Sequence, residues 1–215
     1  MDTLTFEIPK PADLFAHDFL QFLKAKTQGK WAIEDCTIKV VYCKDDLWDD
    51  LGNISDAVTI GTPEEYAERP DTSTVEGWRK VNAFYLLPAR KENDRVSITK
   101  LSRQERKFML ADLGFVGSLG WAADPLSIFD AVVFLNQSAV VRRARSQIAF
   151  PDHQLIAHEV AHIAEKLSGG QIHLSQWLNS RLVESPDVEK LFMEFLEATG
   201  TKEFARRYMA HQPVP

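Results

Sequence analysis

Three residues of the stretch 152–167 have types and a spacing that could perform metal-dependent hydrolysis: His158, Glu159 and His162. On a helix, residues four apart differ by about 40°, so both imidazoles lie on one face and can reach the same metal ion. Glu159 is turned about 100° from His158, beside that ion, where its carboxylate can hold a water molecule. The pattern therefore predicts a metal-activated water as the attacking group.

The helix that carries these residues must be packed on its other side. Ile156, Val160, Ile163 and Leu167 fall about 140–200° from the first histidine on a helical wheel, so they form an apolar stripe opposite the pair. We therefore expect one face of this helix to be buried and the histidine face to be open to water.

A catalytic zinc ion takes three protein ligands and leaves a fourth position for water, so the pair needs a partner. Glu184 follows His162 beyond a glycine-containing turn, and an antiparallel returning helix would bring it to the level of the pair. His173, which follows the same glycines, is the alternative ligand. Glu165 shares the histidine face but lies about one turn further along. We expect His158, His162 and Glu184 to be the ligands of one zinc ion.

Periodicity and capping residues predict the elements around this helix. Helices are expected at residues 11–28 and 45–51, in a short segment that begins at residue 62, and at 102–113, 174–184, 185–200 and 201–211. Strands are expected at 36–42, 57–60, 81–87 and the first half of 131–141. In the second half of the chain a sheet strand is followed by a run of helices, which predicts an α+β fold.

The charged run 88–95 is a predicted surface loop and a soft boundary. It separates residues 1–95, an N-terminal α/β part of unknown role that can belong to the same domain, from residues 96–215, which carry the histidine helix. A chain of 215 residues suits one domain, or one domain with an appendage.

The charge balance argues against nucleic-acid and anionic-membrane partners. The net charge is -6, so no general basic surface is expected. The local run Arg142, Arg143 and Arg145 is interpreted as a solvated helix face.

Several features favour a cytoplasmic protein. No apolar run has the length of a membrane span, and the first residues lack the features of a signal peptide. Cys36 and Cys43 would face opposite sides of one strand, too far apart for a disulfide, so we expect packed thiols.

Residues 131–187 resemble the core of a gluzincin, the thermolysin-like branch of the zincin metallopeptidases. The elements that carry the resemblance are the strand end Phe134-Leu135-Asn136, the His158-Glu159-x-x-His162 motif, the glycine turn at Gly170, and Glu184 followed by Asp187. The resemblance implies a zincin-like fold, in which a small mixed sheet and an active-site helix are followed by a helical C-terminal part.

The same resemblance implies a peptidase that acts on a peptide or protein substrate. Glu159 would be the general base, and His173 would stabilise the oxyanion, with Tyr208 and His211 as later candidates for that role. Asp187 would orient a ligand histidine.

In the family, the strand before the helix is the sheet edge that pairs with an extended peptide. Asn136 and its neighbours would accordingly line the substrate cleft.

Two other classes of protein share these residues. One is an interaction or regulatory protein with structural zinc, in which His158, His162, Glu184 and His173 form a closed shell and no hydrolysis occurs. The other is a zincin-like binding module without metal, which the complete motif argues against. Nothing in the sequence predicts the oligomeric state.

Overall fold

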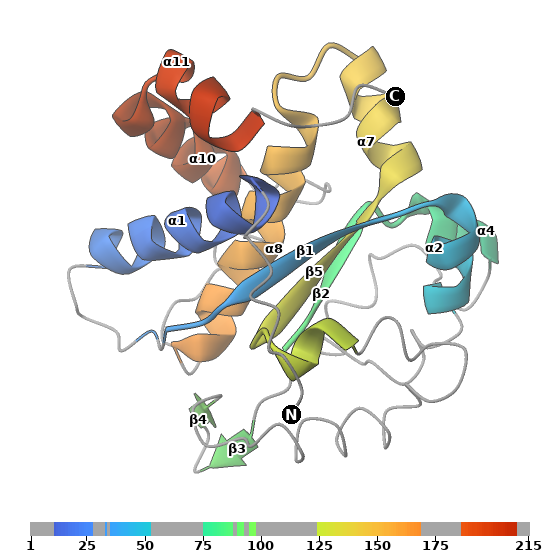
Figure 1. Cartoon of the computed structure of the whole chain (residues 1–215), viewed down its shortest axis with the longest axis horizontal. Helices are drawn as coiled ribbons and strands as arrows, with labels where there is room; N and C mark the ends of the chain where they lie inside the picture. The colour runs from blue at the N-terminus through green and yellow to red at the C-terminus, as the bar shows by residue number, and fades with distance from the viewer. Residues whose placement is uncertain are drawn as a thin grey trace, which may run out of the picture.

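The computed structural model describes residues 11–27, 33, 35–52, 75–87, 90–92, 95–97, 124–168 and 186–209. It is a mixed α+β structure, as predicted, built on a three-stranded sheet (Figure 1). The strand order is β1 (Ile38–Cys43), β5 (Ala131–Asn136), β2 (Ala83–Leu86). Strand β5 runs parallel to β1 and antiparallel to β2, with Val40 and Tyr85 as the two partners of Val133.

Strand β5 is the central strand of this sheet, and all of its residues are buried. Its apolar run from Ala131 to Leu135 suits a strand that is covered on both faces. Because β1 and β2 occupy its two sides, the expectation that this strand forms the sheet edge is wrong. Within the described sheet, β2 lies at one edge and β1 at the other.

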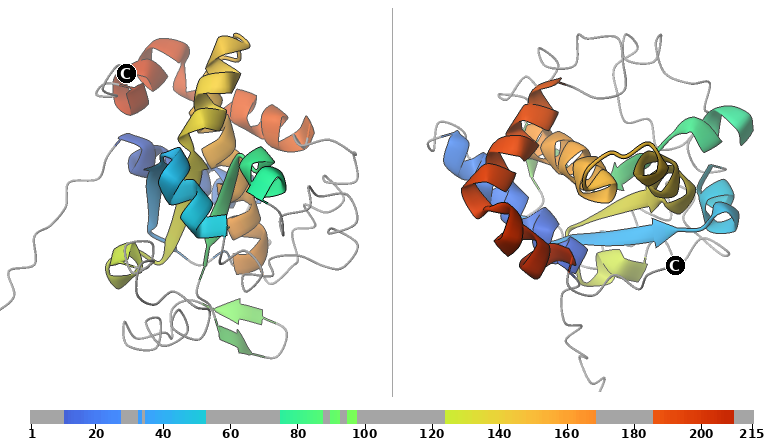
Figure 2. Two further views of the ribbon diagram at one scale, coloured as in Figure 1. Left: turned by 90° about the vertical axis from the view of Figure 1, so that its right-hand side faces the viewer. Right: turned by 90° about the horizontal axis from the view of Figure 1, so that it is seen from above.

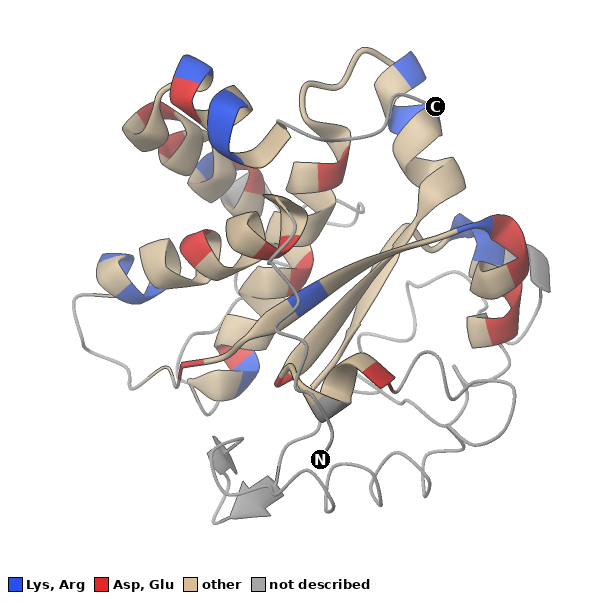
Figure 3. Ribbon diagram, viewed as in Figure 1, with Lys and Arg blue, Asp and Glu red and all other residues tan. Residues whose placement is uncertain are grey.

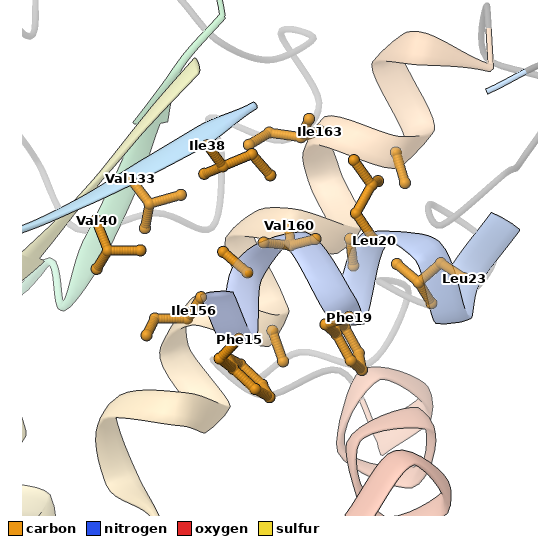
Figure 4. Packing of buried hydrophobic residues seen from close by; sticks show 14 of the residues in the cluster. Phe15, Phe19, Leu20, Leu23, Ile38, Val40, Val133, Ile156, Val160 and Ile163 are labelled. Carbon is orange, nitrogen blue, oxygen red and sulfur yellow. The ribbon is translucent and has the colours of Figure 1, made fainter. Parts of the chain in front are cut away.

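Helices α1 (Pro11–Lys26) and α8 (Pro151–Leu167) cover one face of the sheet (Figures 1 and 2). Figure 4 shows the core between them, in which Phe15 and Leu20 of α1, Val160 of α8 and Val133 of the sheet belong to one cluster of buried side chains. Both helices were predicted from their apolar periodicity and are confirmed.

The C-terminal part adds α10 (Pro186–Thr199), α11 (Thr201–Phe204) and the π-helical turn η3 (Ala205–Met209) to the same side. Rings from these elements pack edge to face on Phe15 of α1, with centroids 5.5–6.1 Å apart. The helices predicted at 185–200 and 201–211 are confirmed over their described residues, although the second ends as a π-helix.

A smaller core lies on the opposite face of the sheet, where α2 (Asp45–Gly52) and α4 (Val75–Lys80) pack. Trp48 and Trp78 stack with centroids 5.0 Å apart, and each indole N–H donates to the other residue's carbonyl oxygen. Val132 and Phe134 meet this core because alternate residues of a strand face opposite sides. The aspartates of α2, red in Figure 3, are exposed or half-buried, while Trp48 and Leu51 of the same helix are buried.

The strand predicted for the first half of 131–141 is confirmed as β5, which ends at Asn136. Helix α7 (Gln137–Arg145) begins directly after β5, and the Asn136 side chain accepts a hydrogen bond from Ala139 N at 3.2 Å. Asparagine is a preferred N-cap residue, and this cap outweighs the strand propensity of Val140 and Val141. Asn136 is 2% exposed and serves as a cap, which corrects its expected place in a substrate cleft.

The charged run 88–95 contains more structure than the predicted loop. Strands β3 (Arg90–Glu92) and β4 (Arg95–Ser97) pair antiparallel, with Lys91 opposite Val96. Elsewhere, the 3-10 helix η2 (Asp124–Ser127) precedes β5.

The described parts of residues 1–95 and 96–215 both contribute to the three-stranded sheet and to its larger core, since β1, β2 and α1 pack on β5 and α8.

The predicted packed thiols are confirmed: Cys36 and Cys43 are both free and buried. Burial raises the pKa of the Cys43 thiol to about 12. Among the helices described, none combines the length and apolar character that crossing a membrane requires.

Candidate metal centre

Helix α8 fixes the orientation of the histidine motif. It begins with Pro151 in its first turn and ends at Ser168, whose N–H bonds to Ala164 O. The apolar stripe is confirmed, because Ile156, Val160 and Ile163 are fully buried against α1 and the sheet (Figure 4). This packing leaves the opposite face of the helix to the histidines.

The two histidines of the motif converge on one point. Nε2 of His158 and Nε2 of His162 are 3.0 Å apart, and the rings are inclined at 82° with centroids 4.7 Å apart. Zn–N bonds are about 2.0–2.1 Å long, so an ion bound to both nitrogens holds them no more than about 4 Å apart. The observed separation therefore fits two ligands of a single ion.

The protonation of the pair decides what it can bind. If one ring carries a proton on Nε2, its N–H donates to the other ring at this distance. If both nitrogens are deprotonated, two lone pairs face the same region, which is the form that a metal ion requires. Both rings are partly exposed, so an ion can reach them from solvent.

Glu159 lies next to the first histidine and is only 7% exposed. Carboxylates are rarely so buried unless they have a partner or a chemical role. The helix places Glu159 about 100° from His158, as the sequence predicted.

A second carboxylate lies on the far side of His162. The Glu165 carboxylate is 3.8 Å from Nδ1 of His162, the nitrogen that does not face His158. The ring of Tyr85, from β2, lies nearly parallel to the His162 ring at 6.1 Å. Glu165 is therefore placed to orient the ring from behind, as carboxylates commonly do for ligand histidines.

The remaining predicted site residues fall elsewhere. Glu184, His173, Gly170 and His211 lie outside the described residues, as does the side chain of Asp187. Within the described ranges, no three His, Cys, Asp or Glu side chains gather closely enough to hold a metal ion.

Tyr208 is a buried residue of the aromatic core and not a group of the histidine face. It is 1% exposed, and its hydroxyl donates to Asp18 at 2.7 Å. Burial and this hydrogen bond raise the pKa of the Tyr208 hydroxyl. The structure thus places Tyr208 of η3 against α1, away from the role of oxyanion donor.

Sequence reasoning gave no role to the buried polar group at the start of α8. His153 is fully buried, its Nδ1 lies 2.8 Å from Asp152, and its ring packs edge to face on Phe15 and Phe204. The hydroxyl of Tyr42, from β1, donates to the other oxygen of Asp152 at 2.9 Å. An Asp-His pair inside an otherwise apolar stretch is the sequence signal that could have revealed this group.

No protein-family model matches the chain, and comparisons with curated proteins and with solved structures gave no match either.

Proposed function

We propose that the chain is a zinc-dependent metallopeptidase with a zincin-like fold, as its resemblance to gluzincins implies. The observation that carries the proposal is the convergence of two imidazole nitrogens, 3.0 Å apart, on the open face of a helix whose other face is buried. The adjacent Glu159 supports it, because the motif needs a carboxylate beside the pair.

In this proposal His158, His162 and Glu184 hold the ion. When bound, zinc lowers the pKa of a water towards about 7 and polarises the scissile carbonyl. Glu159 takes the proton of the attacking water and delivers it to the leaving amine. His173 donates a hydrogen bond to the developing oxyanion.

The position of the substrate follows from the corrected strand order. An extended peptide can add to a sheet only at an edge, and β5 is enclosed on both sides. We therefore assign peptide pairing to β2 (Ala83–Leu86), an edge of the described sheet that packs on α8. Tyr85 of this strand stacks on His162, which brings the strand next to the histidine face.

The experiment is the Glu159→Gln variant, with zinc content measured by elemental analysis and hydrolysis measured on a set of unfolded proteins. Zinc should stay bound while hydrolysis disappears, because the amide keeps the size of the side chain but cannot accept the proton. Glu189→Gln, an exposed substitution on α10, is the matched control and should keep full activity. Retained turnover in Glu159→Gln, or wild-type protein that binds no zinc, would overturn the proposal.

Chelation separates this function from a structural-zinc protein. Helix α8 is held by its buried stripe, so we expect the fold to survive removal of metal while hydrolysis stops. Unfolding on chelation, without cleavage of any peptide before it, would favour the closed shell of four ligands.

A further inference from the structure

A cleft of about 570 Å³ lies beside the ends of β1 and β5, away from the histidine pair. One wall is the start of α2 with Lys44 and Asp45, and the other is a face of α7. Ligand-binding crevices commonly lie outside the carboxyl ends of parallel strands, and β1 and β5 are parallel.

The α7 wall of the cleft is a continuous helical face. Ser138, Val141, Arg142 and Arg145 are spaced i, i+3, i+4 and i+7, so they lie above one another. Arg143 is turned roughly 140° from Ser138 and donates to Gln154 of α8 at 2.8 Å. The cleft therefore opens on the side of α7 that is turned away from α8.

The charges of the cleft are unbalanced. Lys44, Arg142 and Arg145 give three positive charges and Asp45 one negative charge, a balance of 3 − 1 = +2, in a chain whose net charge is -6. Asp45 accepts a hydrogen bond from Ser138 Oγ at 2.5 Å. None of the three cationic side chains has a hydrogen bond or ion pair to another residue in the part of the chain that the structure describes.

We propose that this cleft binds the phosphate group of a small organic molecule. Two guanidinium groups one turn apart present parallel donors that match the oxygens of a phosphate, and Lys44 adds a third cation from the other wall. Val141 is 37% exposed and offers an apolar contact for the organic part. The cleft is open to solvent along one side, so a small phosphate compound can enter it directly.

The test is isothermal titration of the full chain with inorganic phosphate and with glycerol phosphate, and with succinate as a dicarboxylate of similar charge. Both phosphates should bind saturably at one site, glycerol phosphate more tightly because of the apolar contact. The Arg142→Gln/Arg145→Gln variant should lower the affinity at least tenfold, and Lys44→Gln should lower it less.

The matched control is Lys190→Gln/Lys202→Gln, which removes the same charge from exposed positions on α10 and α11. It should bind phosphate as the wild type does. An equal loss in this control, equal affinity for succinate, or absence of saturable binding would overturn the proposal.

Thermal unfolding checks that the arginine variant is folded, and Arg142→Lys/Arg145→Lys, which keeps the charge without the planar donors, should bind with intermediate affinity. These readouts need neither zinc nor hydrolysis, so they stand apart from the peptidase proposal.

Discussion

Helix α8 carries two histidine environments that differ in burial and in their nearest partners. His153, in the first turn, is fully enclosed by aromatic rings and bonded to Asp152. His158 and His162, in the middle turns, are partly exposed and direct Nε2 atoms at each other. The comparison teaches that burial and partners, and not residue type, distinguish a histidine that supports the fold from the two that we propose as metal ligands.

The largest expected effect is on metal affinity. His158→Ala removes one of the proposed nitrogen ligands, and zinc binding of about 10–16 kcal/mol shared over three protein ligands predicts a loss of about 4 kcal/mol, or about 1,000-fold. Competition with a chromophoric chelator measures it. The free energy of unfolding of the metal-free protein should change by less than about 1 kcal/mol, because the side chain is partly exposed. A variant with unchanged zinc affinity would remove the distinction between the two environments.

The reciprocal change is His153→Ala. Loss of a buried ring and of its bond to Asp152 should lower the free energy of unfolding by about 3 kcal/mol, as measured by urea titration. Zinc affinity should stay within about threefold of the wild type, because the residue lies more than a turn from the pair. A stable variant with impaired zinc binding would show that His153 belongs to the metal centre.

The partners of His153 should have smaller effects. Asp152→Asn weakens the hydrogen bonds that the carboxylate makes with the Tyr42 hydroxyl and with the backbone N–H and Nδ1 of His153, and we expect a loss of about 2 kcal/mol in unfolding free energy. Tyr42→Phe removes one of these bonds and leaves the carboxylate, so about 1 kcal/mol is expected. Urea titration measures the unfolding free energy of both variants. A larger loss of unfolding free energy for Tyr42→Phe than for Asp152→Asn would contradict the hydrogen bonds assigned to Asp152.

The smallest effect is expected at Glu165, which lies behind His162. Glu165→Gln should weaken zinc binding about tenfold, the lower end of the range for carboxylates that orient ligand histidines, because the contact is 3.8 Å long. Lys166→Gln, an exposed neighbour on the same helix, is the control and should bind zinc as the wild type does. A loss as large as that of His158→Ala would instead make Glu165 a direct ligand.

Local sequence signals predicted most of the described elements. The stripe of Ile156, Val160 and Ile163 predicted both the span of α8 and its buried face. Apolar residues that repeat about every 3.6 positions all lie on the same side of a helix. The sequence did not give the start of α7, since it predicted a helix only around Arg142, Arg143 and Arg145, and the cap at Asn136 begins this helix at Gln137. Propensity is a weak guide wherever a single hydrogen bond can decide the local conformation.

The sequence by itself determined that His158 and His162 share a helical face, because helix geometry depends only on residues a few positions apart. Only the tertiary structure decided that β5 is enclosed and β2 lies at an edge, and that His153 is buried among rings from α1 and α11. These outcomes depend on contacts between segments far apart in the chain. Residue spacing within a short stretch reports only on neighbours along the chain. Contacts between distant segments are seen only once the chain is packed in three dimensions.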